Sequence, residues 1–339
     1  MKRFVCWLAL CCMILCAGAG CGLDAISGVQ ERTFPPDANA SPLPIEPVGG
    51  DVAPGKLSVT LYYRYNSEPY LAPYPAQIEA TGDKPLVQTL LEQLIQGPDG
   101  AYSEYSALID PRTRVLAIQE KNGYLEVTLS EQYFDSLTPR QSQWDAGSEL
   151  LEAETRLRKQ LALYSIVNTI TEMGRYSRVM IMIDRESGIV DKLKRSEAGL
   201  EQFAERAIDP LGRDISCVIT LNRSASLAMD ALRDREWSTL GLLVAAVDID
   251  GSLAPYSDEL AGALQSRPAL IDYEISGEET IMPGRTEQGI EQAVLRVDVR
   301  FRDALGNIIQ SDNIPLRMVR QTGVWRIPYA SLDMLVPKS

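Results

Sequence analysis

The stretch from 157 to 183, LRKQLALYSIVNTITEMGRYSRVMIMI, constrains the fold of this chain more than any other. Its apolar residues recur at i, i+3, i+4, i+7 and i+10, which predicts one buried stripe along a helix. Glycine adopts the left-handed backbone conformation easily, so Gly174 predicts the end of that helix. The unbroken apolar run 179–183 then predicts an inner strand covered on both faces. The stripe consists of Leu163, Ile166, Val167, Ile170 and Met173.

The residues before this stretch predict the rest of one domain. A strand is expected at 57–65, and Pro85 opens a helix that ends at Gly97 and Pro98. Asn122-Gly123 is a strong hairpin signal and joins expected strands at 114–120 and 124–130. The resulting order is β-α-β-β-α-β, an α+β arrangement shared with split βαβ folds. The Tyr- and Pro-rich segment 70–75 is expected to be a loop whose aromatic rings pack on their own domain, with an exposed binding surface as the alternative.

Three runs in this region carry a family resemblance: YSIVNTITE at 164–172, LLEQLIQGP at 90–98 and NGYLEVTLS at 122–130. In their order and spacing they resemble the GerMN domain family, which is associated with bacterial sporulation and spore-germination lipoproteins. The resemblance covers about 57 to 214 and makes Asn168 and Thr169 a candidate interaction surface. The alternative for both is structural, because short polar side chains near a helix end commonly bond to backbone.

A second domain is expected after a polar stretch at 187–216, which should hold a helix at 198–207 and a boundary near the turn 209–212. Helices at 226–246 and 256–264 precede an alternating strand with Leu295, Val297, Val299 and Phe301 on one face. Further strands follow at 314–318 and 323–327. Helices followed by an antiparallel sheet resemble the nuclear-transport-factor-2-like (cystatin-like) cone fold. Because a boundary should carry few apolar contacts, the two domains are expected to fold independently.

The N-terminus predicts export and lipidation. Lys2 and Arg3 precede an apolar run at 4–15 that is short for a membrane span, and small residues lead to Cys21. We expect a signal peptide at 1–20, lipid attachment at Cys21 and a Pro/Gly-rich tether over 21–55, with an ordinary secreted protein as the alternative. The full expected layout is a signal peptide at 1–20, a lipidated tether at 21–55, a GerMN-like domain at 56–215 and a nuclear-transport-factor-2-like domain at 217–339.

Composition excludes several classes of function. A net charge of −13 argues against nucleic acid, which demands a basic surface. The absence of histidine excludes a Ser-His or Cys-His nucleophile and zinc sites built on histidine. Cys217 is therefore expected to be a buried small residue rather than a nucleophile. Asp248 to Gly251 with Glu259 resembles a calcium loop, but Leu253 stands where glycine is required, so a turn is expected. We expect no catalytic residues, no cofactor and no metal.

The expected function is that of a non-enzymatic lipoprotein on the extracytoplasmic face of the cell membrane. It would act as an assembly or interaction module in sporulation or spore germination, as the family resemblance implies. Its expected partners are the membrane, through the N-terminal lipid, and envelope or sporulation proteins, with peptidoglycan as a further candidate. The alternative is a module that binds a small molecule or a peptidoglycan fragment, and an enzyme such as a wall hydrolase is a third hypothesis.

Overall fold

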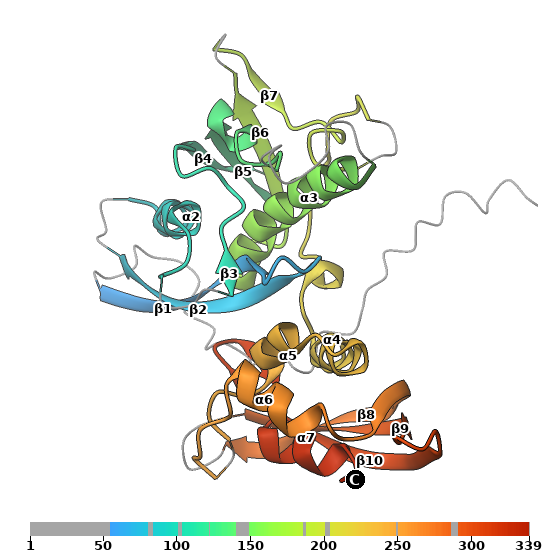
Figure 1. Cartoon of the computed structure of the whole chain (residues 1–339). Helices are drawn as coiled ribbons and strands as arrows, with labels where there is room; N and C mark the ends of the chain where they lie inside the picture. The colour runs from blue at the N-terminus through green and yellow to red at the C-terminus, as the bar shows by residue number, and fades with distance from the viewer. Residues whose placement is uncertain are drawn as a thin grey trace, which may run out of the picture. The chain divides into compact units, whose positions relative to one another are not determined.

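The computed structural model describes residues 55–80, 84–100, 104–121, 123–139, 149–185, 188–200, 204–248, 250–285 and 291–338, without the side chains of 277–285 (Figure 1). The expected signal peptide, Cys21, the tether to residue 54 and Asn122 lie outside these residues. We call residues 55–217 the first part and residues 218–338 the second part. The fold is α+β, with helices and sheets in both parts. No helix among the described residues is long and apolar enough to cross a membrane.

The first sheet has the order β2-β1-β3, with both pairs antiparallel. The expected loop at 70–75 is wrong, because Leu71 onwards forms strand β2 beside β1. Proline is tolerated on an edge strand when its missing N–H would point away from the sheet, and Pro73 and Pro75 lie in such a strand. Tyr74 is buried and packs edge-on against Tyr63, so the expected packing of this ring on its own domain is confirmed. The Tyr70 ring lies instead 4.9 Å from the guanidinium of Arg223, a residue of the second part. The strands are β1 (Gly55–Tyr65), β2 (Leu71–Ala80) and β3 (Tyr105–Ser106).

The second sheet has the order β4-β5-β6-β7, in which β5 and β6 are parallel and the outer pairs antiparallel. The expected hairpin is confirmed: Lys121 pairs with Tyr124 across a turn where Gly123 has a φ of +85°. The apolar run at 179–183 is an inner strand, as expected. The strands are β4 (Val115–Lys121), β5 (Tyr124–Ser130), β6 (Val179–Asp184) and β7 (Val190–Lys192).

Two helices complete this arrangement. Helix α2 (Leu86–Gln96) begins after Pro85 and ends at Gly97, as expected. Helix α3 (Glu149–Glu172) begins well before the apolar stripe and contacts both β1 and β6 (Figure 1). Gly174 lies just beyond α3 with a φ of +71°, which confirms the expected helix end. A short 3-10 helix, η2 (Glu131–Phe134), follows β5. The long helix therefore links the two sheets of the first part.

The polar stretch at 187–216 is part of the packed first part. The helix expected at 198–207 is wrong for the described residues, which form turns and the bridge between Lys194 and Ala207. Gly199 explains the difference, because its φ of +74° is incompatible with a continuing right-handed helix. A Cβ at Gly199 would lie 2.3 Å from the Arg156 carbonyl oxygen, so this segment lies directly on α3. Buried Leu193, Ala198 and Ile208 belong to the core, and η4 (Ile215–Cys217) ends the stretch.

The second part is an antiparallel sheet of order β11-β10-β9-β8 with four helices. Strand β9 buries Leu295, Val297, Val299 and Phe301 on one face, as its alternation predicts. The helix expected at 226–246 is divided, because Arg235 has a left-handed φ of +58°. The last helix was not expected, and the cone-fold resemblance remains a prediction. The elements are α4 (Leu221–Asp234), α5 (Trp237–Leu243), α6 (Ser257–Leu264), β8 (Ala269–Arg285), β9 (Glu291–Arg302), β10 (Ile308–Gln321), β11 (Val324–Arg326) and α7 (Tyr329–Leu335).

Candidate functional site at the end of helix α3

Asn168 lies inside the protein, near the C-terminal end of α3, with none of its surface exposed. Its Nδ2 donates to the carbonyl oxygen of Asp214, and its Oδ1 accepts from the N–H of Asp214, both at 2.9 Å. A buried amide that satisfies two backbone groups stabilises the fold, because unpaired buried polar groups are unfavourable. Asn168 therefore fastens α3 to the segment that leads out of the first part.

Thr169, which is also fully buried, fastens the same helix to β1. Its Oγ1 accepts a hydrogen bond of 3.1 Å from the backbone N–H of Tyr62. In the described strands, β3 pairs with β1 only through Arg64 and Tyr65. The backbone N–H of Tyr62 lies beyond those two residues and has no partner there among the described strands. The Thr169 hydroxyl accepts its hydrogen bond instead, as buried backbone donors generally require.

Tyr62, Glu172 and Arg213 form a polar triangle beside these bonds. The Tyr62 hydroxyl donates to Glu172 Oε2 at 2.9 Å and accepts from an Arg213 guanidinium nitrogen at 2.7 Å. That guanidinium also lies 2.6 Å from Glu172 Oε2, as an ion pair. Burial, reinforced by the Glu172 carboxylate, raises the pKa of Tyr62 well above its usual value. The phenol therefore stays protonated and remains a hydrogen-bond donor.

Nearer the start of α3, Glu154 pairs with Arg64, which in turn bonds the backbone of the turn between β1 and β2. Arg64 is 4% exposed and pairs with Glu154, while its other nitrogens donate to the carbonyl oxygens of Ser67 and Glu68. Burial alone would raise the pKa of Glu154, but hydrogen bonds from Arg64 and Arg158 lower it overall. Helix α3 thus binds β1 at two places through charged side chains that are largely buried.

These positions correct the expectation of an exposed interaction surface at Asn168 and Thr169. Both side chains are consumed by contacts within the chain, as the structural alternative proposed, so neither can itself touch a partner in this structure. Sequence reasoning missed Tyr62 and Arg213 as members of the cluster. No local signal could have found them, because only the fold brings β1 and the segment after residue 212 to the end of α3.

Cys217 lies against this cluster and is confirmed as a buried structural residue. Its Sγ donates to the carbonyl oxygen of Asp214 at 3.0 Å and lies 3.6 Å from Asn168 Nδ2. Burial raises the pKa of the Cys217 thiol to about 12, so the reactive thiolate is scarce near neutral pH. This arrangement is the opposite of the one that activates a cysteine nucleophile.

The calcium-loop resemblance resolves into the expected turn. Asp248 is 4% exposed and accepts a hydrogen bond of 2.8 Å from the N–H of Ala330. Glu259 accepts from the N–H of Tyr256 at 3.2 Å and so closes the start of α6. Glu259 thus caps its own helix, and Asp248 joins its turn to the start of α7 far along the chain. Among the residues that the structure describes, no group of three or more His, Cys, Asp or Glu side chains is placed to hold a metal ion.

Comparison with known proteins relates the first part of the chain to sporulation proteins. Residues 60–187 match the Germane family model, described as "Sporulation and spore germination". The match covers less than half of the chain, so it supports a GerMN-like domain in the first part and assigns nothing to the second. No curated protein matches the chain.

Solved structures with low sequence identity also match. One holds the tandem GerMN domains of the sporulation protein GerM from Bacillus subtilis, at 16% identity and a TM-score of 0.31, covering 50% of this chain and 49% of that one. The chain thus spans about half the length of that protein. The first GerMN domain of GerM alone matches at 14% identity and a TM-score of 0.30, covering 46% and 98%. A putative lipoprotein from Clostridium perfringens matches at 20% identity and a TM-score of 0.27, covering 50% and 95%.

Proposed function

We propose that this protein is a non-enzymatic lipoprotein of the cell envelope that acts as an assembly or interaction module in sporulation or spore germination. The match of residues 60–187 to the sporulation and germination family carries the proposal. The polar groups around the end of α3 (Tyr62, Asn168, Thr169, Glu172, Arg213 and Cys217) support a scaffold role. Their side chains are directed at the protein's own backbone and at one another, and the thiol is held in the unreactive form.

The anchor is proposed at Cys21, on the strength of the positively charged N-terminus, the short apolar run and the small residues before the cysteine. The test is to express Cys21→Ala in the native host and to separate membrane from soluble fractions. Cys16→Ala is the matched control, because Cys16 follows the bulky Leu15 and is the poorer attachment site. We expect release of the Cys21 variant and full retention of the Cys16 variant. Unchanged retention of both would remove the anchor from the proposal.

The biological role is tested by deleting the gene in the native host and restoring it as wild type or as Cys21→Ala. Heat-resistant spores and the rate of germination are counted for each strain. We expect a defect that the wild-type gene repairs and the unanchored variant repairs poorly. Normal sporulation and germination of the deletion strain would contradict the proposed role.

The non-enzymatic part of the proposal needs its own assay. The purified protein is incubated with isolated cell wall, and soluble fragments are measured against a known wall hydrolase. We expect no release above background. Protein-dependent release of fragments would establish an enzyme and would leave the family relationship intact.

A further inference from the structure

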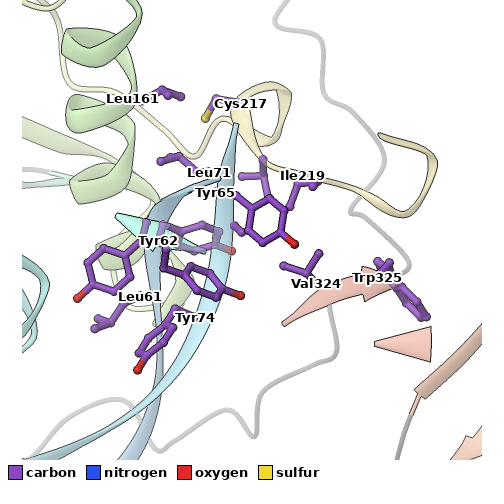
Figure 2. Packing of buried hydrophobic residues seen from close by; sticks show 14 of the residues in the cluster. Leu61, Tyr62, Tyr65, Leu71, Tyr74, Leu161, Cys217, Ile219, Val324 and Trp325 are labelled. Carbon is purple, nitrogen blue, oxygen red and sulfur yellow. The ribbon is translucent and has the colours of Figure 1, made fainter. Parts of the chain in front are cut away.

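Two buried tyrosines of the first part donate hydrogen bonds to backbone of the second part. The Tyr65 hydroxyl donates to the carbonyl oxygen of Leu242 at 3.0 Å, and the Tyr105 hydroxyl donates to that of Thr322 at 2.5 Å. The two rings pack edge-on with centroids 5.8 Å apart. Figure 2 shows Tyr65 in the same apolar cluster as Val324 of strand β11. The end of the first sheet is therefore covered by the chain's own second part.

An ion pair lies beside these tyrosines. An Arg326 guanidinium nitrogen of β11 lies 2.8 Å from Glu104 Oε1, and only 10% and 12% of the two side chains are exposed. Removing one member of a buried ion pair is strongly unfavourable, because the other charge is left without a partner. The pair thus favours one particular packing position of β11 against the first part.

The turn between β10 and β11 lies so close to the first part that it leaves no room for a side chain at Gly323. Thr322 and Gly323 both have positive φ, +50° and +87°, as a tight hairpin turn requires. A Cβ added to Gly323 would lie 2.0 Å from the carbonyl oxygen of Pro73 on β2. Gly306, in the turn between β9 and β10, has nearly the same φ of +88°, but a Cβ there would meet nothing within 4 Å. Of these two turns, only the one with Gly323 has a side chain excluded by contact with the first part.

We propose that Tyr65, Pro73, Glu104 and Tyr105 form a docking surface for a β-hairpin turn, and that the β10–β11 hairpin of this chain occupies it. Arg326 neutralises the charge of Glu104. Gly323 has no side chain and therefore lets the turn lie against the Pro73 carbonyl. The docked hairpin makes the two parts one cooperative unit, against the expectation from sequence that they fold independently. It also closes this surface of the GerMN-like part to other proteins while the hairpin is seated.

The first test compares Gly323→Ala with Gly306→Ala in the chain from residue 22 onwards. Both variants place a side chain in a hairpin turn at nearly the same positive φ, so the main difference between them is the contact with Pro73. Hydrogen exchange is followed in peptides covering β2 and β11. We expect at least about tenfold faster exchange in both peptides for Gly323→Ala, since loss of docking opens both sides together. Gly306→Ala should accelerate exchange only near its own turn. Equal behaviour of the two variants in β2 would overturn the proposal.

The second test reverses the ion pair. Glu104→Arg and Arg326→Glu are prepared singly and together, and urea unfolding is followed for each chain. Each single reversal should lower the unfolding midpoint, and the double variant should recover most of the loss. The coupling should reach about tenfold in the unfolding equilibrium constant. Reversal of the exposed pair Lys84 and Glu92 is the control and should change little. A double variant no more stable than the less stable single variant would overturn the proposed docking. If a single variant fails to fold, the double variant must fold for the proposal to stand.

Discussion

The side-chain amide of Asn168 and the backbone of Asp214 are joined by two hydrogen bonds of 2.9 Å, in the manner of two paired strands. One residue of α3 thereby satisfies both backbone groups of a residue far along the chain. The signature-like run at the end of α3 thus stabilises the fold. Substitutions in it should first lower the free energy of unfolding, and any loss of function should follow from that.

Replacing Asn168 with alanine should lower the free energy of unfolding by about 1–3 kcal/mol, because the Asp214 N–H and carbonyl lose their partner in a buried place. Urea unfolding measures this loss. In cells, sporulation or germination should decline in step with the amount of folded protein. An Asn168→Ala protein of normal stability that no longer supports sporulation would instead restore a direct binding role for this side chain.

Replacing Ile170 with alanine should cost about 2–5 kcal/mol, because this fully buried side chain leaves a cavity between α3 and its neighbours. Leu150→Ala on the same helix is the matched control. Leu150 is 69% exposed, so its loss should change stability by no more than about 0.5 kcal/mol. Similar losses for the two variants, measured by urea or thermal unfolding, would contradict the observed packing of α3.

Tyr62→Phe removes one hydroxyl from the triangle with Glu172 and Arg213 and leaves the ring in place. The lost hydrogen bond goes to a charged group at a buried position, so the free energy of unfolding should fall by about 1.5–3 kcal/mol. Tyr256→Phe, at a tyrosine that is 82% exposed, should be neutral. If Tyr62→Phe were as stable as the wild type, the hydrogen bond from the Tyr62 hydroxyl to Glu172 would contribute nothing measurable to holding β1 on α3.

The thiol of Cys217 should be silent towards thiol reagents in the native protein at pH 8 and react fully in urea. A chain that starts at residue 22 contains no other cysteine, so the assay is unambiguous. Burial raises the pKa of this thiol from 9.0 to about 12, so the native state holds the proton more tightly than the unfolded state. Its contribution to stability is complete below about pH 9 and is lost as the pH rises towards about 12.

That pH dependence is isolated by comparison with Cys217→Ala, since buried tyrosines titrate in the same alkaline range. The difference in unfolding free energy between the two proteins should shrink as the pH rises from 9 to 12. Rapid labelling of the folded protein at pH 8 would show that the cysteine is reached by solvent more often than its burial indicates.

Elements with a strong local pattern could be predicted from the sequence. The alternation in β9, the glycine after α3 and the Asn122-Gly123 hairpin each carry their own cause within a few residues. Strand β2 could not be predicted, because its prolines indicate a loop unless the neighbouring strand is already known. The helix expected at 198–207 failed because Gly199 has a left-handed backbone where it meets Arg156. The site partners Tyr62 and Arg213 depend on contacts between distant segments, which leave no local pattern.

The two prolines of β2 also bear on how this protein can assemble. Pro73 pairs with Tyr62 and Pro75 with Thr60, and the N–H of Tyr62 is turned towards Thr169, away from β2. In that register, the missing N–H groups of both prolines belong to the outer side of the sheet. A strand from another molecule would find two absent donors along that edge and could not complete a ladder there. A polymer of this protein, if built strand by strand, would have to grow from some other edge.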